Sequence, residues 1–272
     1  MFNCNGLIVS RLINAEPELI YNLHKDFSFI ENIRFYNGKI LFWEKHYFRI
    51  IANLRRYRYK IPISFTMEKL EKELIKVTNI IDSKITNGLY RCQFIKAYSE
   101  TKFIISITDL NPIEINTSNY KVDLYKDIFM FSNDLSNMSK TNSDLRLISS
   151  MYAKENGLDD VVLLNDQKKV TETLNGTIFL LESNQIQTPN LLSGCQNLVF
   201  REVFLEWLIK FNKSYDVIER EINPFELQKS EEIFIISLES GLQCVSNYKK
   251  SSYSNNKSYH LFEKFVSYLV YL

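Results

Sequence analysis

Three groups of residues in the middle of the chain have the types and spacing needed for chemistry on a small charged molecule. Glu172 stands at the end of an apolar run and is followed by the turn dipeptide Asn175-Gly176 and a second apolar run. A strand end of this kind can aim a carboxylate at a ring nitrogen. Lys140, upstream, offers an amine that can act as a nucleophile. The segment 193–201 leads into a helical pattern, whose first amides suit an anion.

A further candidate group lies at positions 46–49. His46 and Arg49 are three positions apart in an expected helix, so they share one face. The guanidinium of Arg49 offers a fork of donors that matches phosphate oxygens. Taken alone, such an arginine is most simply a surface residue. Only together with the other groups does it indicate a phosphate-binding site.

The bulk composition excludes several classes of function. The 272 residues carry a net charge of +1, with 45% hydrophobic and 24% charged residues, as in ordinary globular proteins. This balance gives no electrostatic footprint for nucleic acid or an anionic membrane. The basic cluster at 55–60 is short and is interpreted as a solvated helix end. No apolar run reaches the length of a membrane span, and no secretory signal is visible at the N-terminus.

The cysteines and histidines give no metal-binding pattern. The four cysteines form no C-x-x-C pair, and a chain of this length does not need disulfides. We therefore expect reduced thiols and a cytoplasmic location. The three histidines are His24, His46 and His260, which are far apart and show no zinc spacing, so no metal site is predicted.

The expected secondary structure mixes helices and strands throughout. In the first part, Asn37-Gly38 between two apolar runs predicts a hairpin over 30–43. The other elements expected there are helices over 44–59 and from Thr66 onward, and strands over 89–97 and 102–108. Later in the chain we expect strands over 120–131, 160–164, 169–172, 177–181, 233–237 and 241–245, and helices over 144–156, 200–212 and 259–272. The stretch 109–117 contains Pro112 and polar residues that disfavour helix, and it marks the predicted boundary: a domain at 1–112, a linker at 113–118 and a larger domain at 119–272.

With these motifs in place, the chain resembles the class IV (fold type IV) pyridoxal phosphate (PLP)-dependent enzymes. This family includes branched-chain and D-amino acid aminotransferases and aminodeoxychorismate lyase. Positions 46–49 resemble its H-x-x-R motif, 172–179 resemble its E-x-x-x-G/S-N-I/L-F motif, and 188–189 resemble its T-P. The resemblance covers nearly the whole chain. It implies an α/β (α+β) fold with a small N-terminal α/β domain and a larger C-terminal mixed-sheet domain that binds the cofactor.

The resemblance also implies a role for each candidate residue. Lys140 would be the catalytic residue and would form the Schiff base with PLP, which Lys126 and Lys154 fit less well by position. Glu172 would keep the pyridine nitrogen protonated, and Arg49 would bind the phosphate. The residues expected to hold the cofactor are Arg49, Lys140, Glu172, Asn175, Val199, Phe200, Ser237 and Leu238. Val199 and Phe200 would act through backbone amides at a helix start, where Leu198 replaces the family's glycine.

Two departures from the family pattern leave the substrate open. The segment 24–32 retains Asp26 and Glu31 from the family's Y-G-D-G-x-F-E-T string but loses its glycines, and Leu145 stands where branched-chain enzymes have a tyrosine. The leading hypothesis is transfer of an amino group between an amino acid and a 2-oxo acid. The alternatives are an aminodeoxychorismate lyase, which eliminates pyruvate to give 4-aminobenzoate, and a non-catalytic homologue that acts as a binding protein. The family further implies a homodimer that acts on small molecules.

Overall fold

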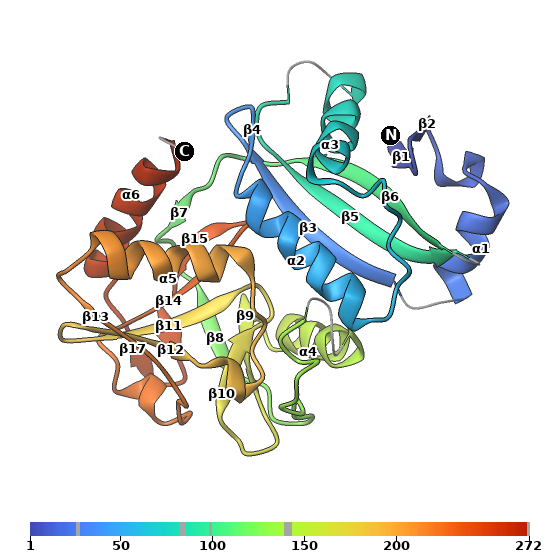
Figure 1. Ribbon diagram of the computed structural model, residues 1–272. Helices are drawn as coiled ribbons and strands as arrows, with labels where there is room; N and C mark the ends of the chain where they lie inside the picture. The colour runs from blue at the N-terminus through green and yellow to red at the C-terminus, as the bar shows by residue number, and fades with distance from the viewer. Residues whose placement is uncertain (26–27, 82–84, 98–99, 139–142, 271–272) are drawn as a thin grey trace. The chain divides into compact units, whose positions relative to one another are not determined.

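The chain folds into two compact units, Met1–Pro112 and Ile113–Leu272, in a computed structural model (Figure 1). The residues that the structure describes are 1–25, 28–81, 85–97, 100–138 and 143–270. Each unit has its own sheet structure and its own hydrophobic core. The expected mixture of helices and strands is therefore confirmed, whereas the assignment of 113–118 as a linker between folding domains stays a prediction.

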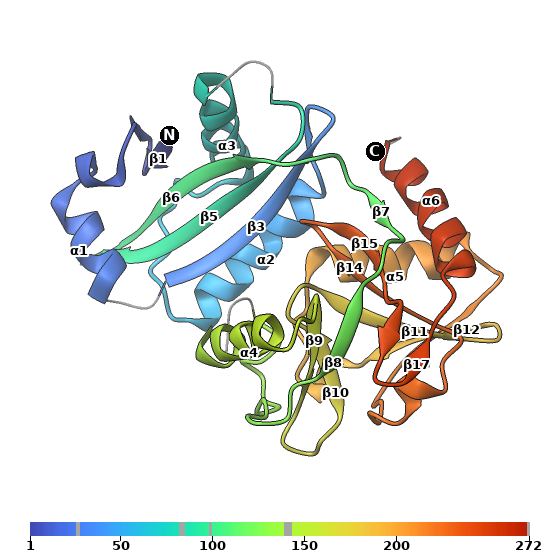
Figure 2. The same cartoon turned by 180° about the vertical axis from the view of Figure 1, so that it is seen from behind.

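The first unit is built on one antiparallel sheet with strand order β2-β1-β6-β5-β3-β4. Its strands are β1 (Phe2–Cys4), β2 (Leu7–Val9), β3 (Ser28–Tyr36), β4 (Lys39–Ile40), β5 (Gly88–Ala97) and β6 (Glu100–Asp109). Its helices are α1 (Pro17–Lys25), α2 (Trp43–Arg56) and α3 (Met67–Ile81), with the 3-10 turn η1 (Leu12–Asn14) before α1. The long strands β3, β5 and β6 run side by side (Figure 2).

The predicted hairpin at Asn37-Gly38 is confirmed. Tyr36 pairs with Lys39 across a two-residue turn, and both turn residues have positive φ, 49° for Asn37 and 79° for Gly38. This conformation matches the right-handed twist of the flanking strands, which is why Asn-Gly favours it. The second arm, β4, is only two residues long because helix α2 begins soon after it.

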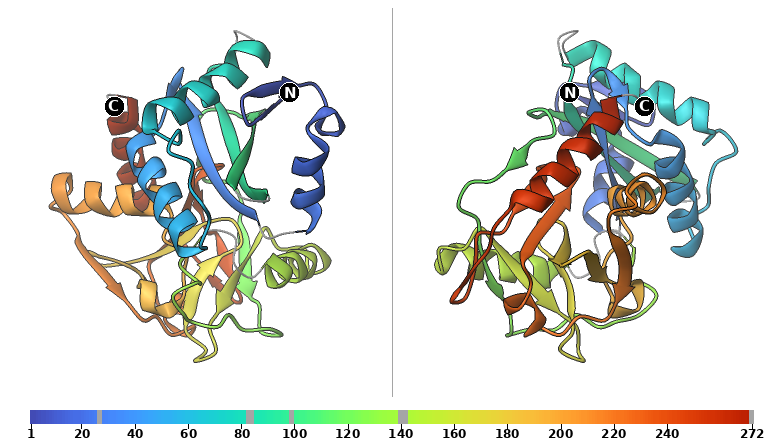
Figure 3. Two further views of the ribbon diagram at one scale, coloured as in Figure 1. Left: turned by 45° about the vertical axis from the view of Figure 1, so that its right-hand side comes forward. Right: turned by 90° about the vertical axis from the view of Figure 1, so that its left-hand side faces the viewer.

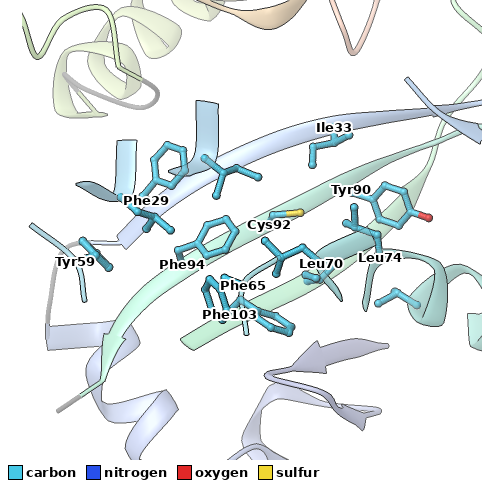
Figure 4. Close-up of a cluster of buried hydrophobic side chains, with 14 of the residues drawn as sticks. Phe29, Ile33, Tyr59, Phe65, Leu70, Leu74, Tyr90, Cys92, Phe94 and Phe103 are labelled. Carbon is cyan, nitrogen blue, oxygen red and sulfur yellow. The ribbon is translucent and has the colours of Figure 1, made fainter. Parts of the chain in front are cut away.

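Helices cover both faces of this first sheet. Helices α2 and α3 lie on one face and α1 on the other (Figure 3). Successive strand residues point to opposite faces. On β5, Phe94 therefore belongs to the core under α2 and α3, whereas the next residue, Ile95, packs with Leu19 of α1. Phe29, Phe94 and Phe103 lie together in the larger cluster (Figure 4).

The second unit contains two sheets, with strand orders β10-β9-β8-β16-β17 and β13-β12-β11-β14-β15-β7. Its strands are β7 (Ile115–Asn116), β8 (Lys121–Leu124), β9 (Asp160–Leu164), β10 (Val170–Thr173), β11 (Thr177–Glu182), β12 (Gln185–Pro189), β13 (Asp216–Arg220), β14 (Glu232–Ser237), β15 (Gly241–Cys244), β16 (Asn247–Tyr248) and β17 (Ser251–Ser252). Its helices are α4 (Ser143–Glu155), α5 (Val199–Phe211) and α6 (Asn256–Val270), with the 3-10 turns η2 (Leu191–Ser193) and η3 (Glu226–Gln228).

The two sheets of this unit enclose a buried apolar layer between them. Val162 of β9 and Ile178 and Leu180 of β11 meet in this layer. Between them on β11, Phe179 points the other way and stacks on Phe234, with ring centroids 5.1 Å apart. Helices α5 and α6 cover that outer face with further aromatic rings, whereas α4 packs on the opposite side of the unit against β9.

One expected strand is much shorter than predicted. The sequence predicts a strand over 120–131, but β8 ends at Leu124, and only Met130 returns to the sheet, in a bridge with Asn165. The charged residues Lys126 and Asp127 interrupt the pairing. Both are exposed, and a buried sheet position would have cost their solvation.

Candidate active site

The carboxylate of Glu172 lies buried at the end of β10. Its side chain is 5% exposed, and its Oε2 accepts a hydrogen bond from the backbone N–H of Gln196 at 2.8 Å. Its Oε1 forms an ion pair with the guanidinium of Arg146 on α4. The fold therefore brings Glu172 to the segment 193–201, and its contact with a cofactor stays a prediction. Arg146 is a neighbour that the sequence analysis did not identify.

A second buried carboxylate fixes the turn that follows Glu172. Asp160 is fully buried and accepts hydrogen bonds from the backbone N–H groups of Leu174 at 3.0 Å and Asn175 at 3.3 Å. Burial raises the pKa of Asp160 to about 6, although a hydrogen bond from the side chain of Thr173 and these backbone hydrogen bonds oppose the rise. The neighbouring Arg146 has its pKa lowered to about 10 by burial, and the charge of Asp160 partly counters that shift.

The Asn175-Gly176 turn is shaped by close backbone packing. A Cβ placed on Gly176 would lie 2.3 Å from the carbonyl oxygen of Ile236, so only glycine fits there. The side-chain amide of Asn175 donates to the hydroxyl of Tyr120 at 3.1 Å and to the carbonyl of Asp159 at 3.3 Å. In this structure, Asn175 thus holds the turn, and its predicted contact with a cofactor stays a prediction.

The segment after η2 leads into α5 with its first amides free of a side-chain cap. Leu198 is the N-cap residue and makes no capping hydrogen bond, so it does not satisfy the N–H groups of the first turn. Arg201 fixes this helix start by donating to the carbonyl of Pro189 at 2.9 Å and pairing with Glu219 at 2.7 Å. Val199 and Phe200 are buried in the first turn, where the helix dipole favours an anion.

Ser237 lies at the end of β14, where it shares a hollow with Asn175. The hollow measures about 330 Å³. Its lining residues are Tyr120, Asp159, Asn175, Ser237, Glu239, Ser240 and Gln243. The Ser237 hydroxyl lies 2.7 Å from that of Ser240. Leu238, the next residue, is half-buried in the β14–β15 turn. The contacts of these two residues with a cofactor stay predictions.

In the first unit, the H-x-x-R face of α2 meets a buried carboxylate. Glu31 of β3 is 3% exposed; its Oε1 lies 2.7 Å from Nδ1 of His46, and its Oε2 pairs with Arg49. Burial alone would raise the pKa of Glu31, but the charge of Arg49 and the hydrogen bond from His46 lower it below the ordinary value. Nε2 of His46 is buried and has no hydrogen-bond partner among the described residues.

The sequence does not reveal this role of Glu31, because its motif assigns the residue only to the substrate segment. A buried acidic residue on an apolar strand is the signal that could have indicated it, because buried carboxylates require partners. Asp26, the other retained acidic residue of that motif, lies outside the described residues.

Lys140 also lies outside the described residues, which omit 139–142. The two alternative lysines, Lys126 and Lys154, are both exposed. Leu145, at the position where branched-chain enzymes have a tyrosine, is buried in the core beneath α4. The next residue along the helix, Arg146, is the one that reaches Glu172.

Comparison with known proteins identifies the family. The model of class IV aminotransferases matches residues 28–248, which is most of the chain. The chain belongs to the class IV aminotransferase family. Its curated relatives include proteins assigned as branched-chain-amino-acid aminotransferases in Rickettsia typhi and Methanocaldococcus jannaschii. The Rickettsia typhi protein is 23% identical over 89% of this chain and 85% of its own length. The Methanocaldococcus jannaschii protein is 24% identical over 75% of this chain and 73% of its own length.

Solved structures share the fold of this class IV chain. The branched-chain amino acid aminotransferase of Escherichia coli has a TM-score of 0.84 at 15% identity and covers 98% of this chain and 93% of its own. A Legionella pneumophila protein assigned as 4-amino-4-deoxychorismate lyase has a TM-score of 0.80 at 16% identity and covers 91% and 93%. The predicted family and fold type are confirmed, and with the family its cofactor, PLP.

The described residues of the second unit fit the two polar ends of PLP. A carboxylate has about four lone-pair sites, and Glu172 uses two of them for Arg146 and Gln196, so it can still accept from a protonated ring nitrogen. The uncapped amides at Val199 and Phe200 suit the phosphate. None of the described helices is both long and apolar enough to cross a membrane.

Proposed function

We propose that this class IV aminotransferase uses Lys140 to bind PLP and moves an amino group between an amino acid and a 2-oxo acid. The observation that supports this assignment best is the buried Glu172, held by the N–H of Gln196 just before the uncapped start of α5. A carboxylate for a ring nitrogen and an amide cluster for a phosphate are the two features that bind this cofactor. When bound, PLP supplies an aldehyde for the amino group and a ring that draws electrons from the substrate's Cα.

Each residue in the proposal has a separate task. Glu172 would accept a hydrogen bond from the protonated ring nitrogen and so keep the ring electron-poor. The amides of Val199 and Phe200 and the hydroxyl of Ser237 would bind the phosphate, and Leu238 and Asn175 are proposed as further contacts of the cofactor. Arg49 adds a charged fork to the phosphate, and Glu31 holds that fork in a fixed direction.

Lys140 has two tasks in the proposal. It would hold the aldehyde carbon of the cofactor, and its amine would move the proton at the substrate's Cα. An amine can accept a proton only when it is neutral, so the second task requires the uncharged form of Lys140. Replacing Lys140 with alanine removes both tasks at once.

A lyase that eliminates pyruvate from aminodeoxychorismate is the second candidate. Leu145 in place of the tyrosine of branched-chain enzymes supports it, and so does the likeness to the Legionella pneumophila protein. The substrates separate the two functions. An aminotransferase needs a 2-oxo acid acceptor and consumes it, whereas the lyase releases pyruvate without any acceptor.

Spectroscopy of the purified protein tests the proposal directly. We expect PLP to give a visible absorbance band typical of a lysine-bound cofactor, and borohydride reduction followed by peptide mapping to place the modification on Lys140. The Lys140→Ala variant should lose the band and all turnover. Lys126→Ala and Lys154→Ala are matched controls, because both lysines are exposed, and they should keep the band. Protein without the band, or modification of another lysine, would contradict the assignment.

We also propose a homodimer in the cytoplasm. The family supports the dimer, and sedimentation equilibrium of the purified chain tests it. All four cysteines are buried free thiols, a state that suits a reducing compartment. Localisation of a tagged chain checks this second point.

A further inference from the structure

An arginine occupies one side of the carboxylate that is proposed to face the cofactor ring. Arg146 extends from α4 to Oε1 of Glu172, while the backbone of Gln196 holds Oε2. The side chain of Arg146 is 20% exposed and that of Glu172 is 5% exposed. The ion pair is therefore largely shielded from water, and its charges act on their surroundings more strongly than a surface pair would.

Two carboxylates, each on a different strand, lie near the guanidinium of Arg146. Glu172 of β10 contacts it directly, and Asp160 of β9 lies close enough to influence its charge. Both carboxylates are titratable groups that face Arg146 within the described part of the chain. The cluster thus has one permanent positive charge, since guanidinium does not lose its proton at ordinary pH.

We infer that Arg146 is a positioning residue that shares the carboxylate of Glu172 with the ring nitrogen of PLP and so weakens that nitrogen's hold on its proton. The inference rests on the proposed function. A carboxylate that already neutralises a guanidinium attracts a second positive charge less strongly than a free carboxylate does. The fixed cation also repels a proton on a nearby ring nitrogen.

The consequence for the reaction is that the cofactor ring withdraws electrons from the substrate's Cα less strongly. Glu172 keeps the ring nitrogen protonated, and Arg146 lowers the pH above which that proton, and with it part of the pull on the electrons of Cα, is lost. Arg146 also holds Glu172 in one direction, because a guanidinium fork is rigid and binds carboxylates in a defined geometry. Charge and position are thus both set by a side chain on α4.

The test measures the proton on the ring nitrogen rather than activity. The full-length holoprotein is loaded with ¹⁵N-labelled PLP, and the ¹⁵N chemical shift of the ring nitrogen is followed against pH. Arg146→Met removes the charge, so we expect the pKa of the ring nitrogen to rise by about 1 to 3. Arg146→Gln is a second neutral variant that keeps a polar side chain and should move the pKa in the same direction.

Lys154→Met is the matched control, because it removes one positive charge from an exposed position on the same helix. It should leave the titration unchanged. If either Arg146 variant binds PLP and titrates as the wild type does, the inference is wrong and Arg146 only supports the fold. If the wild-type chain does not bind PLP at all, the proposed function itself fails, so the two failures are distinct.

Discussion

At the scale of single residues, the two units share one arrangement, a buried glutamate paired with an arginine. Glu31 in the first unit and Glu172 in the second are buried carboxylates, and each is paired with an arginine from a helix. A buried ion pair contributes little net stability, because desolvation offsets most of the attraction. Its main effect is geometric, since each partner fixes the other. These pairs are therefore better explained as devices that aim Arg49 and Glu172 than as sources of stability.

The Glu31 pair gives a prediction about pH. The folded-state pKa of Glu31 lies below its ordinary value of 4.5, so the ionised carboxylate stabilises the fold above that pH. This contribution is lost as the pH falls through the folded-state pKa. Glu31→Gln should lower the free energy of unfolding by about 3 kcal/mol at pH 7, because it leaves the Arg49 charge without its carboxylate. Urea unfolding of both proteins between pH 3 and pH 7 measures the difference.

The same series contains its own control. Glu44→Gln changes an exposed carboxylate on α2 and should cost less than about 0.5 kcal/mol at any pH. The gap between wild type and Glu31→Gln should narrow below pH 4.5. A gap that is constant over the whole range would show that the ionised form of Glu31 is not what stabilises the fold.

At the scale of elements, the turn after β10 depends on a close backbone contact as well as on the hydrogen bonds of Asn175. Gly176→Ala would place a methyl group against the carbonyl of Ile236, where β11 begins its pairing with β14. Because the contact is with backbone, side-chain rotation cannot relieve it. We expect a loss of at least about 1–3 kcal/mol in unfolding free energy and weaker PLP binding, measured by urea unfolding and by titration of the apoprotein.

Gly157→Ala separates crowding from backbone strain. Gly157 follows α4 with φ of +63°, and a methyl group added to it would meet no atom within 4 Å. Replacing Gly157 with alanine should therefore lower the free energy of unfolding by only about 1 kcal/mol, the cost of holding a residue with a Cβ in the left-handed conformation. If both alanine variants lose the same stability, the close approach to Ile236 does not matter.

Elements with local signals could be predicted from the sequence, and those that depend on distant partners could not. The Asn37-Gly38 turn was predictable because two adjacent residues fix its conformation. The pairing of Arg146 with Glu172 was not, because it requires α4 to pack on β9 beside β10. Likewise, the pairing of β8 with β9 extends only to Leu124, and no local apolar pattern encodes that limit.

At the scale of the whole molecule, the two units have separate hydrophobic cores, and each contains one of the two tryptophans. Trp43 packs at the edge of the first core, and Trp207 lies on α5 among the rings of the second unit. The resemblance implied a fold of two domains, and the stretch around Pro112 indicated where one domain would end. The sequence did not show that Glu31 would pair with an arginine in the first unit, as Glu172 does in the second.

The tryptophans allow the two cores to be followed separately. Trp207→Phe leaves Trp43 as the only indole, and Trp43→Phe leaves Trp207, so fluorescence during urea unfolding reports one unit at a time. We expect different midpoints for the two variants, since multi-domain chains depart from two-state unfolding. PLP at about 100 times its Kd should stabilise the unit reported by Trp207 by about 2.7 kcal/mol, because Glu172 and the start of α5 belong to it. Coincident midpoints with and without PLP would instead mean that the chain unfolds as one cooperative unit.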